Sequence, residues 1–95
     1  MLNQQLQQQL ISLLTPYRPE RVCIFGSFAR GDNKQGSDLD VLIKFQEVVG
    51  LLELVQLEQE LSDKLGIKVD LVTEGSLKNP RLRQYVQQDL IKILG

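Results

Sequence analysis

The sequence predicts an α/β domain in which helices flank a small β-sheet. Helical periodicity marks both ends and the middle of the chain, and short β-branched or alternating apolar runs lie between these segments. The 95 residues contain no internal repeat and no linker, so we expect a single domain over residues 1–95. The expected order is helix, strand, turn, strand, helix, strand, helix, whereas strand order and direction do not follow from the pattern.

The first half of the chain contains one helix and one strand. Residues 2–14 form a helix because leucines recur at helical spacing with glutamines opposite them, and Thr15-Pro16 ends it. Residues 21–25, RVCIF, form a short apolar strand. Residues 26–37 form a turn or short helix followed by a polar loop. The helical residues expected to point mostly inward are Leu2, Leu6, Leu10, Ile11, Leu13 and Leu14.

Two further helices are expected in the second half. Residues 50–65 have helical periodicity that Glu58 interrupts, and Gly66 ends this helix. Asn79-Pro80 has the residue types of an N-cap and a first helical position, so a last helix begins there. The residues expected to point inward are Leu51, Leu54, Val55, Leu61 and Leu65 on the middle helix, and Leu82, Tyr85, Val86, Leu90, Ile93 and Leu94 on the last.

Composition excludes several classes of protein. The net charge of −1 argues against a general nucleic-acid binder, which would be strongly basic. No window is long and apolar enough for a membrane span, and we expect no signal peptide. The lone Cys23 cannot form an internal disulfide, which predicts a reducing, cytoplasmic location and a buried thiol. The chain has no histidine, which excludes His-ligated zinc and mechanisms based on Ser-His or Cys-His pairs.

Three aspartates lie on the polar faces of two predicted strands. Residues 38–45, DLDVLIKF, alternate so that Asp38 and Asp40 share one face, with Cα atoms roughly 6–7 Å apart. Residues 67–72 form the third strand, and Asp70 lies opposite its apolar face. Carboxylates this close repel each other. They are therefore either exposed to solvent on an edge strand or ligands of a divalent cation, and hard oxygen ligands suit Mg²⁺.

A candidate phosphate site precedes these aspartates. Gly26 follows the first predicted strand and allows backbone N–H groups to approach an anion, while Ser27 adds a hydroxyl donor. Arg30 binds phosphate, pairs with a carboxylate to hold the loop, or is simply exposed. Ser37 either caps the loop onto Asp38 or contacts phosphate. The candidate nucleotide-binding set is thus Gly26, Ser27, Arg30 and Ser37.

Two further pairs of side chains have both a structural and a functional interpretation. Tyr17 and Tyr85 are core or rim aromatics, and the functional alternative is stacking on a nucleotide base. Arg81 and Arg83 lie in the first turn of the last helix, where cations oppose the helix dipole. They are ordinary surface charges, or they contact a nucleotide or an acidic partner.

Gly26-Ser27, ten intervening residues and then Asp38-Leu39-Asp40 resembles the G-S-x10-D-x-D signature of the polymerase-beta-type nucleotidyltransferase superfamily. The tighter form GSFARG…GSDLDVLI and the chain length resemble the minimal nucleotidyltransferase (MNT) family. The similarity runs from about Arg21 to Val72 and covers most of the chain. It implies a nucleotidyltransferase-type core, in which a small mixed β-sheet is flanked by helices.

The resemblance also implies an activity and roles for the site residues. A nucleoside monophosphate, AMP from ATP, is transferred to an acceptor hydroxyl. Asp38 and Asp40 hold two Mg²⁺ ions, and Asp70 completes the metal site or acts as base toward the acceptor. Gly26 and Ser27 bind the triphosphate. Two-metal sites clamp the attacking and leaving oxygens of an in-line displacement, so the implied roles agree with the chemistry of these residue types.

The family further implies a protein partner. We expect the 95 residues to be taken up by the nucleotide-transfer core, so that a partner supplies the acceptor. The MNT family pairs with HEPN-type ribonuclease toxins, and the resemblance therefore implies an antitoxin that adds AMP to a toxin tyrosine. Two alternatives are a non-catalytic module that neutralises its partner by occlusion and a transferase for a small-molecule acceptor. Nucleotide preference and homo- or hetero-oligomeric state are left open.

Overall fold

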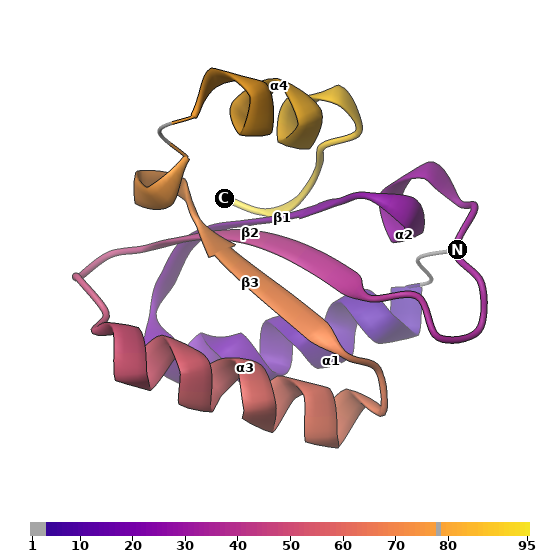
Figure 1. Cartoon of the computed structure of the whole chain (residues 1–95). Coiled ribbons are helices and arrows are strands. Elements are labelled where there is room, and N and C mark those ends of the chain that lie inside the picture. The colour runs from indigo at the N-terminus through magenta and orange to yellow at the C-terminus, as the bar shows by residue number, and fades with distance from the viewer. Residues whose placement is uncertain (1–3, 78) are drawn as a thin grey trace.

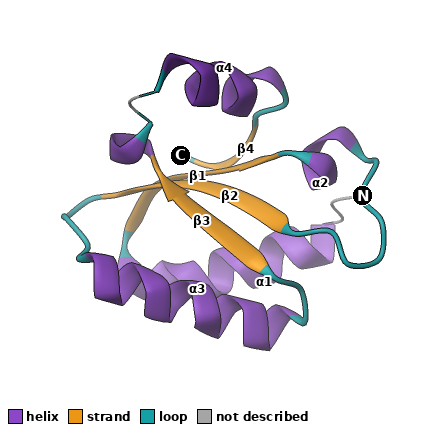
Figure 2. Cartoon of the chain, viewed as in Figure 1, coloured by secondary structure: helices purple, strands orange, loops and turns teal. Residues whose placement is uncertain are grey.

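The computed structural model describes residues 4–77 and 79–95. Within these residues four strands form one mixed sheet in the order β3-β2-β1-β4, with α1 and α3 on one face and α4 on the other (Figures 1 and 2). None of the helices in this part of the chain has the length and hydropathy needed to cross a bilayer. The elements are α1 (Gln4–Leu14), η1 (Thr15–Tyr17), β1 (Pro19–Phe25), α2 (Ser27–Arg30), β2 (Leu39–Phe45), α3 (Leu51–Leu65), β3 (Val69–Thr73), η2 (Glu74–Ser76), α4 (Pro80–Gln88) and β4 (Ile91–Leu94).

Strand β2 lies between two different kinds of pairing. It is antiparallel to β1, where Phe25 is opposite Asp40, and parallel to β3, where Asp40 is opposite Asp70. A parallel pair needs a crossover, and α3 provides it between β2 and β3. The expected class, helices flanking a small mixed sheet, is confirmed.

The sheet separates two apolar clusters. The larger one packs one face of the sheet against α1 and α3 and includes Leu6, Leu10 and Leu14 of α1, as expected from the leucine spacing. Ile11 and Leu13 are partly buried, and the expected inward residue Leu2 lies outside the described residues. The smaller cluster lies under α4 and consists of Cys23, Phe25, Leu42, Leu77 and Val86. Burial of Cys23 matches its expected role as a small apolar core residue.

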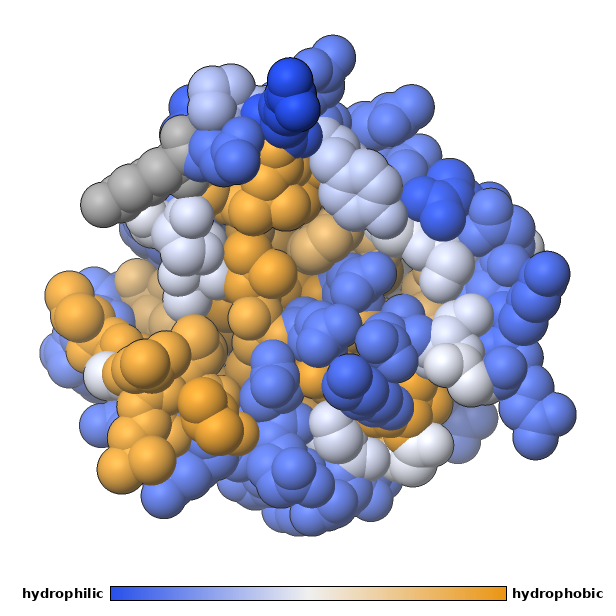
Figure 3. All heavy atoms as spheres, in the orientation of Figure 1, coloured by the Kyte–Doolittle hydropathy of each residue, from blue (hydrophilic) through white to orange (hydrophobic). Residues whose placement is uncertain are grey.

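The predicted inward face of α3 was partly wrong. Leu61 is fully buried, Leu54 and Leu65 are partly buried, and Leu51 and Val55 are 78% and 53% exposed. The buried side of the helix is rotated toward Leu57 and Leu61. Figure 3 shows apolar side chains gathered at its lower left, where Figure 1 places the start of α3. These exposed residues are Val48, Leu51, Leu52 and Val55.

Hydrogen bonds to the edge of the sheet explain this rotation. The backbone N–H of Leu71 donates to Glu58 Oε2 at 2.8 Å, and the N–H of Val69 donates to Ser62 Oγ at 2.9 Å. Both donors lie on β3, the outer strand, whose N–H groups would otherwise need water as acceptor. Glu58, which interrupts the apolar stripe in the sequence, therefore lies against the sheet edge.

The predicted last helix is too long. Helix α4 ends at Gln88, and Ile91–Leu94 forms β4, antiparallel to β1, with Ile24 opposite Ile91. Of the residues expected inward on this helix, only Val86 is buried. The free edge of β1 offers unpaired backbone groups, and the β-branched segment Ile-Lys-Ile-Leu satisfies them better as a strand than as another helical turn.

We predict that Leu61→Ala lowers the free energy of unfolding by about 2–5 kcal/mol, because a fully buried leucine is removed from the core. Leu52→Ala on the same helix is the matched control, since this side chain is 72% exposed, and its effect stays within about 0.5 kcal/mol. Urea unfolding followed by far-UV circular dichroism measures both. Equal losses would contradict the observed orientation of α3.

Candidate active site

The three aspartates meet at one end of the paired strands β2 and β3. Asp38 directly precedes β2, Asp40 is its second residue, and Asp70 is the second residue of β3. Because Asp40 and Asp70 are register partners in a parallel ladder, their side chains leave the sheet on the same face. That face also carries Leu42 and is the one covered by α4. The carboxylates therefore lie beside α4 and away from α1 and α3.

The electrostatics of this end are dominated by carboxylates. Burial, reinforced by Asp70 and Asp38, raises the pKa of Asp40 to about 6, and the positive charge of Arg30 opposes this rise. Burial and Asp38 also raise the pKa of Asp70, against the opposing charge of Lys68. Lys68 Nζ lies 3.8 Å from Asp38 Oδ2. The fold thus holds negative groups at a place where ionising all of them is unfavourable.

The donor set suits Mg²⁺. Three carboxylates supply hard oxygen atoms. A divalent cation would offset the burial and the neighbouring negative charges that raise the pKa values of Asp40 and Asp70. Over residues 4–77 and 79–95, however, no three carboxylate or thiolate side chains are already arranged as a metal cluster. The side chains of Asp38, Asp40 and Asp70 must therefore adjust their rotamers to share a cation, while the backbone register already brings them to one edge.

Gly26 makes the close approach of β1 to Asp40 possible. Its φ of 77° and ψ of −153° lie in a region that is essentially restricted to glycine. A Cβ at this position would overlap Asp40 Oδ2. Its carbonyl oxygen accepts the N–H groups of Ala29 and Arg30, at 3.1 and 3.0 Å, which starts α2. Gly26 therefore contacts the carboxylate site directly, and Ser27 follows it as the first residue of α2.

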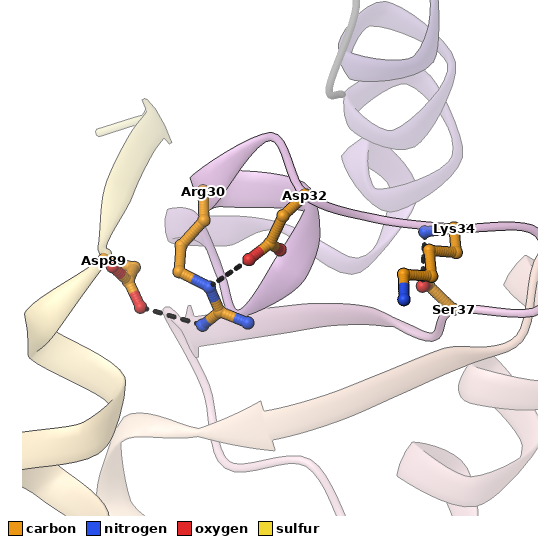
Figure 4. A network of polar contacts seen from close by, with 5 residues as sticks. All are labelled: Arg30, Asp32, Lys34, Ser37 and Asp89. Atoms are coloured by element: carbon orange, nitrogen blue, oxygen red, sulfur yellow. Dashed lines mark hydrogen bonds and ion pairs between the residues drawn. The ribbon is translucent and has the colours of Figure 1, made fainter.

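Arg30 lies between two carboxylates (Figure 4). Its Nε donates to Asp32 Oδ2 at 3.1 Å and its Nη1 donates to Asp89 Oδ2 at 3.0 Å. These contacts, together with one to the Tyr85 hydroxyl, raise its pKa. Of the three alternatives given for Arg30, the structure shows pairing with carboxylates. This pairing connects the end of α2 to the end of α4.

Ser37 lies in the loop before β2. The backbone N–H of Lys34 donates to Ser37 Oγ at 2.8 Å, and the N–H of Ser37 donates to the Lys34 carbonyl at 2.9 Å (Figure 4). Ser37 thus closes a turn with Lys34 and does not cap the loop onto Asp38. The structure therefore brings Gly26 and Ser27 to the aspartates, whereas the Ser37 hydroxyl is engaged within its own loop.

Sequence reasoning did not identify Asp89, which holds Arg30 from the end of α4. Tyr85 was expected to be a core or rim aromatic residue; it is 49% exposed and its ring packs on Phe25 with centroids 6.5 Å apart, as at a rim. Lys68 next to Asp38 was missed as well. These neighbours are 30 to 60 residues apart in the sequence, and no local pattern pairs them. Only the sheet register and the position of α4 bring them together.

Comparisons with known proteins agree with this geometry. The family model described as a nucleotidyltransferase domain matches residues 5–93. A candidate protein adenylyltransferase of Methanocaldococcus jannaschii is 48% identical over 77 residues, which cover 81% of this chain and 79% of the relative. The protein adenylyltransferase MntA of Thermococcus cleftensis is 38% identical over 80 residues, covering 76% and 81%. A crystal structure of a toxin–antitoxin complex with AMP-PNP superposes with a TM-score of 0.84 at 25% identity, covering 94% of this chain and 73% of that chain.

The fold, the acidic strand ends and these matches define the class of the protein as a nucleotidyltransferase. This chain belongs to the nucleotidyltransferase domain family, and the expected resemblance to minimal nucleotidyltransferases is confirmed. The G-S and D-x-D residues on which the resemblance was based, Gly26, Ser27, Asp38 and Asp40, all lie inside the matched region.

We predict that Gly26→Ala destabilises the fold more than Gly31→Ala. Both glycines have positive φ. Gly31 (φ 81°, ψ 15°) is left-handed, where alanine costs about 1–2 kcal/mol, whereas Gly26 (φ 77°, ψ −153°) lies in a region essentially restricted to glycine. Open space surrounds Gly31, whereas a Cβ at Gly26 meets the Asp40 carboxylate. Chemical denaturation measures the stability, and NMR titration of the Asp40 carboxyl reports the displaced side chain. An unchanged Asp40 titration in Gly26→Ala would show that the close approach does not matter.

We also predict that stability without metal falls as pH rises from about 4 to about 6. The pKa of Asp40 is about 6 in the folded chain against an ordinary value of 3.8, so the folded state binds the proton more tightly across this window. Deprotonation then favours the unfolded state. Unfolding free energies at several pH values measure the slope, and Asp40→Asn makes it shallower, with the remainder due to Asp70. A stability that rises across the window would contradict this assignment.

Proposed function

We propose that this chain transfers AMP from ATP to a hydroxyl group of a partner protein, and that it acts in this way as the antitoxin of a HEPN-type ribonuclease toxin in the cytoplasm. One observation carries the proposal. The register of β2 and β3 brings Asp40 and Asp70 to one edge of the sheet, directly beside the Gly26 turn. Relatives named as protein adenylyltransferases and a similar fold in a toxin–antitoxin complex with AMP-PNP support the choice of nucleotide and partner.

We assign cation binding to Asp38, Asp40 and Asp70, which supply hard oxygen ligands at the strand ends. Bound Mg²⁺ ions stabilise negative charge on the transferring phosphoryl group. Because the chain has no histidine, we assign activation of the acceptor hydroxyl to a carboxylate together with the metal. We assign this role to Asp70 as the alternative to completing the metal site; burial and Asp38 raise the pKa of its carboxyl group, which supports a role as base.

We assign triphosphate binding to the turn between β1 and α2. Gly26 allows the backbone to approach the ligand closely, and Ser27 contributes a hydroxyl and an N–H at the start of α2. Arg30 lies three residues, almost one helical turn, after Ser27 and carries a guanidinium whose charge lowers the pKa of Asp40. Contact between Arg30 and phosphate requires the guanidinium to exchange at least one of its bonds to Asp32 and Asp89.

The proposal predicts that the chain, incubated with ATP, Mg²⁺ and the HEPN-type protein encoded beside it, adds mass to that protein in steps of one AMP. Asp38→Asn combined with Asp40→Asn abolishes the transfer, because two of the three proposed cation ligands lose their charge. Intact-mass spectrometry of the partner measures both results. Lys34→Ala is the control for loop integrity and retains transfer, since its side chain is exposed.

Other results of this experiment would replace the proposal. Inhibition of the partner without any nucleotide transfer would assign the chain to the non-catalytic class that acts by occlusion. Transfer that is unchanged in the double variant would refute the metal assignment. Transfer to a small molecule in place of the partner would identify the chain as a transferase for small-molecule acceptors.

A further inference from the structure

Tyr85 lies at the rim of the carboxylate site. Its ring meets Phe25 edge to face, with centroids 6.5 Å apart and an interplanar angle of 89°. Phe25 is the register partner of Asp40 on the neighbouring strand, so both side chains leave the same face of the sheet. Tyr85 is 49% exposed, although it is a large aromatic residue packed on a core residue. The phenol is therefore both anchored beside the site and accessible.

Arg30 connects the Tyr85 hydroxyl to the aspartates. The guanidinium is held from two sides by Asp32 and Asp89, and Asp89 lies one helical turn after Tyr85, at the end of α4. A hydrogen bond to the Tyr85 side chain contributes to the raised pKa of Arg30, and the positive charge of Arg30 lowers the pKa of Asp40 against the effect of burial. Arg30 at the end of α2 therefore relates Tyr85 on α4 to Asp40 on β2.

The other tyrosine has none of these neighbours. Tyr17 packs partly buried against the larger apolar cluster, on the face of the sheet covered by α1 and α3. Its hydroxyl donates to Glu60 Oε2 at 3.3 Å. The aspartates leave the opposite face, so the sheet itself separates Tyr17 from them. The chain therefore contains one tyrosine at the site and one matched control away from it.

We propose that Tyr85 is a self-modification site: without a bound partner, the chain transfers a nucleoside monophosphate from a nucleoside triphosphate to its own Tyr85 hydroxyl, within the same molecule. This inference rests on the proposed nucleotidyl transfer and adds an acceptor that belongs to the chain. The side chain is a hydroxyl nucleophile, it is exposed, and a cation that suits phosphate lies next to it.

The step is balanced without a further reactant. Tyr85 Oη forms a bond to the α-phosphorus of the triphosphate, and the bond from that phosphorus to the oxygen bridging the β-phosphorus breaks. Pyrophosphate leaves, and the phenolic proton passes to a site carboxylate and then to solvent. The product is a tyrosyl phosphodiester with one negative charge beside Arg30. This charge competes with Asp89 for the guanidinium and weakens the connection between α2 and α4.

The test uses the full chain alone with ATP and Mg²⁺, followed by intact-mass spectrometry and tryptic mapping. We expect one AMP per chain on the peptide that covers residues 84–92, which contains Tyr85 and follows the cleavage site at Arg83. Tyr85→Phe and Asp40→Asn abolish incorporation. Tyr17→Phe retains it at the level of the unmodified sequence. AMP on any other peptide, or full incorporation in Tyr85→Phe, overturns the proposal.

A mixing experiment tests transfer within one molecule. Asp40→Asn, which keeps Tyr85 but loses a site carboxylate, is incubated with Tyr85→Phe, which keeps the carboxylates but lacks the acceptor. We expect neither chain to gain AMP, and labelling of Asp40→Asn at Tyr85 would show transfer between molecules instead. The partner assay runs in parallel. A chain that modifies its partner but never itself refutes only the self-modification, whereas a chain that modifies neither refutes the proposed function as well.

Discussion

The pairing of β2 with both of its neighbours is the constraint on which the rest of the structure depends. Backbone hydrogen bonds to β1 and β3 place Phe25, Asp40 and Asp70 in one row across the sheet. The ladder holds the carboxylates of Asp40 and Asp70 side by side and partly buried, and this burial, together with repulsion from neighbouring carboxylates, raises their pKa values. Backbone pairing thus keeps these aspartates together although their charges repel each other.

The outer backbone groups of β3 and of β1 are satisfied in different ways, and both affect the site. On the β3 side, Glu58 and Ser62 accept backbone N–H groups, which orients α3 and leaves the start of that helix apolar and exposed. On the β1 side, β4 completes the sheet and returns the chain beneath α4. A small domain buries a limited core, so each of these edge contacts matters for positioning α4 beside the aspartates.

Arg30 connects the turn before the aspartates to the end of α4. Its bonds to Asp32 and Asp89 hold the turn after β1 against the end of α4, while its charge reaches Asp40. A phosphate ligand and the two carboxylates are alternative partners for the same guanidinium. If Arg30 binds phosphate as proposed, nucleotide binding and the position of α4 are coupled through this one side chain.

The sequence by itself determined the first three strands, the shared face of Asp38 and Asp40, and the glycine turn before them, because alternation and glycine geometry act over a few residues. It also predicted Asp70 as the third acid. Only the tertiary structure decided that Ile91–Leu94 is a strand, that α3 turns Leu57 toward the core, and that Arg30 pairs with Asp89. Each of these depends on a partner far away in the chain: a free sheet edge, backbone N–H groups of β3, and the end of α4. Local periodicity carries no information about such partners, so they become visible only once the sheet has formed.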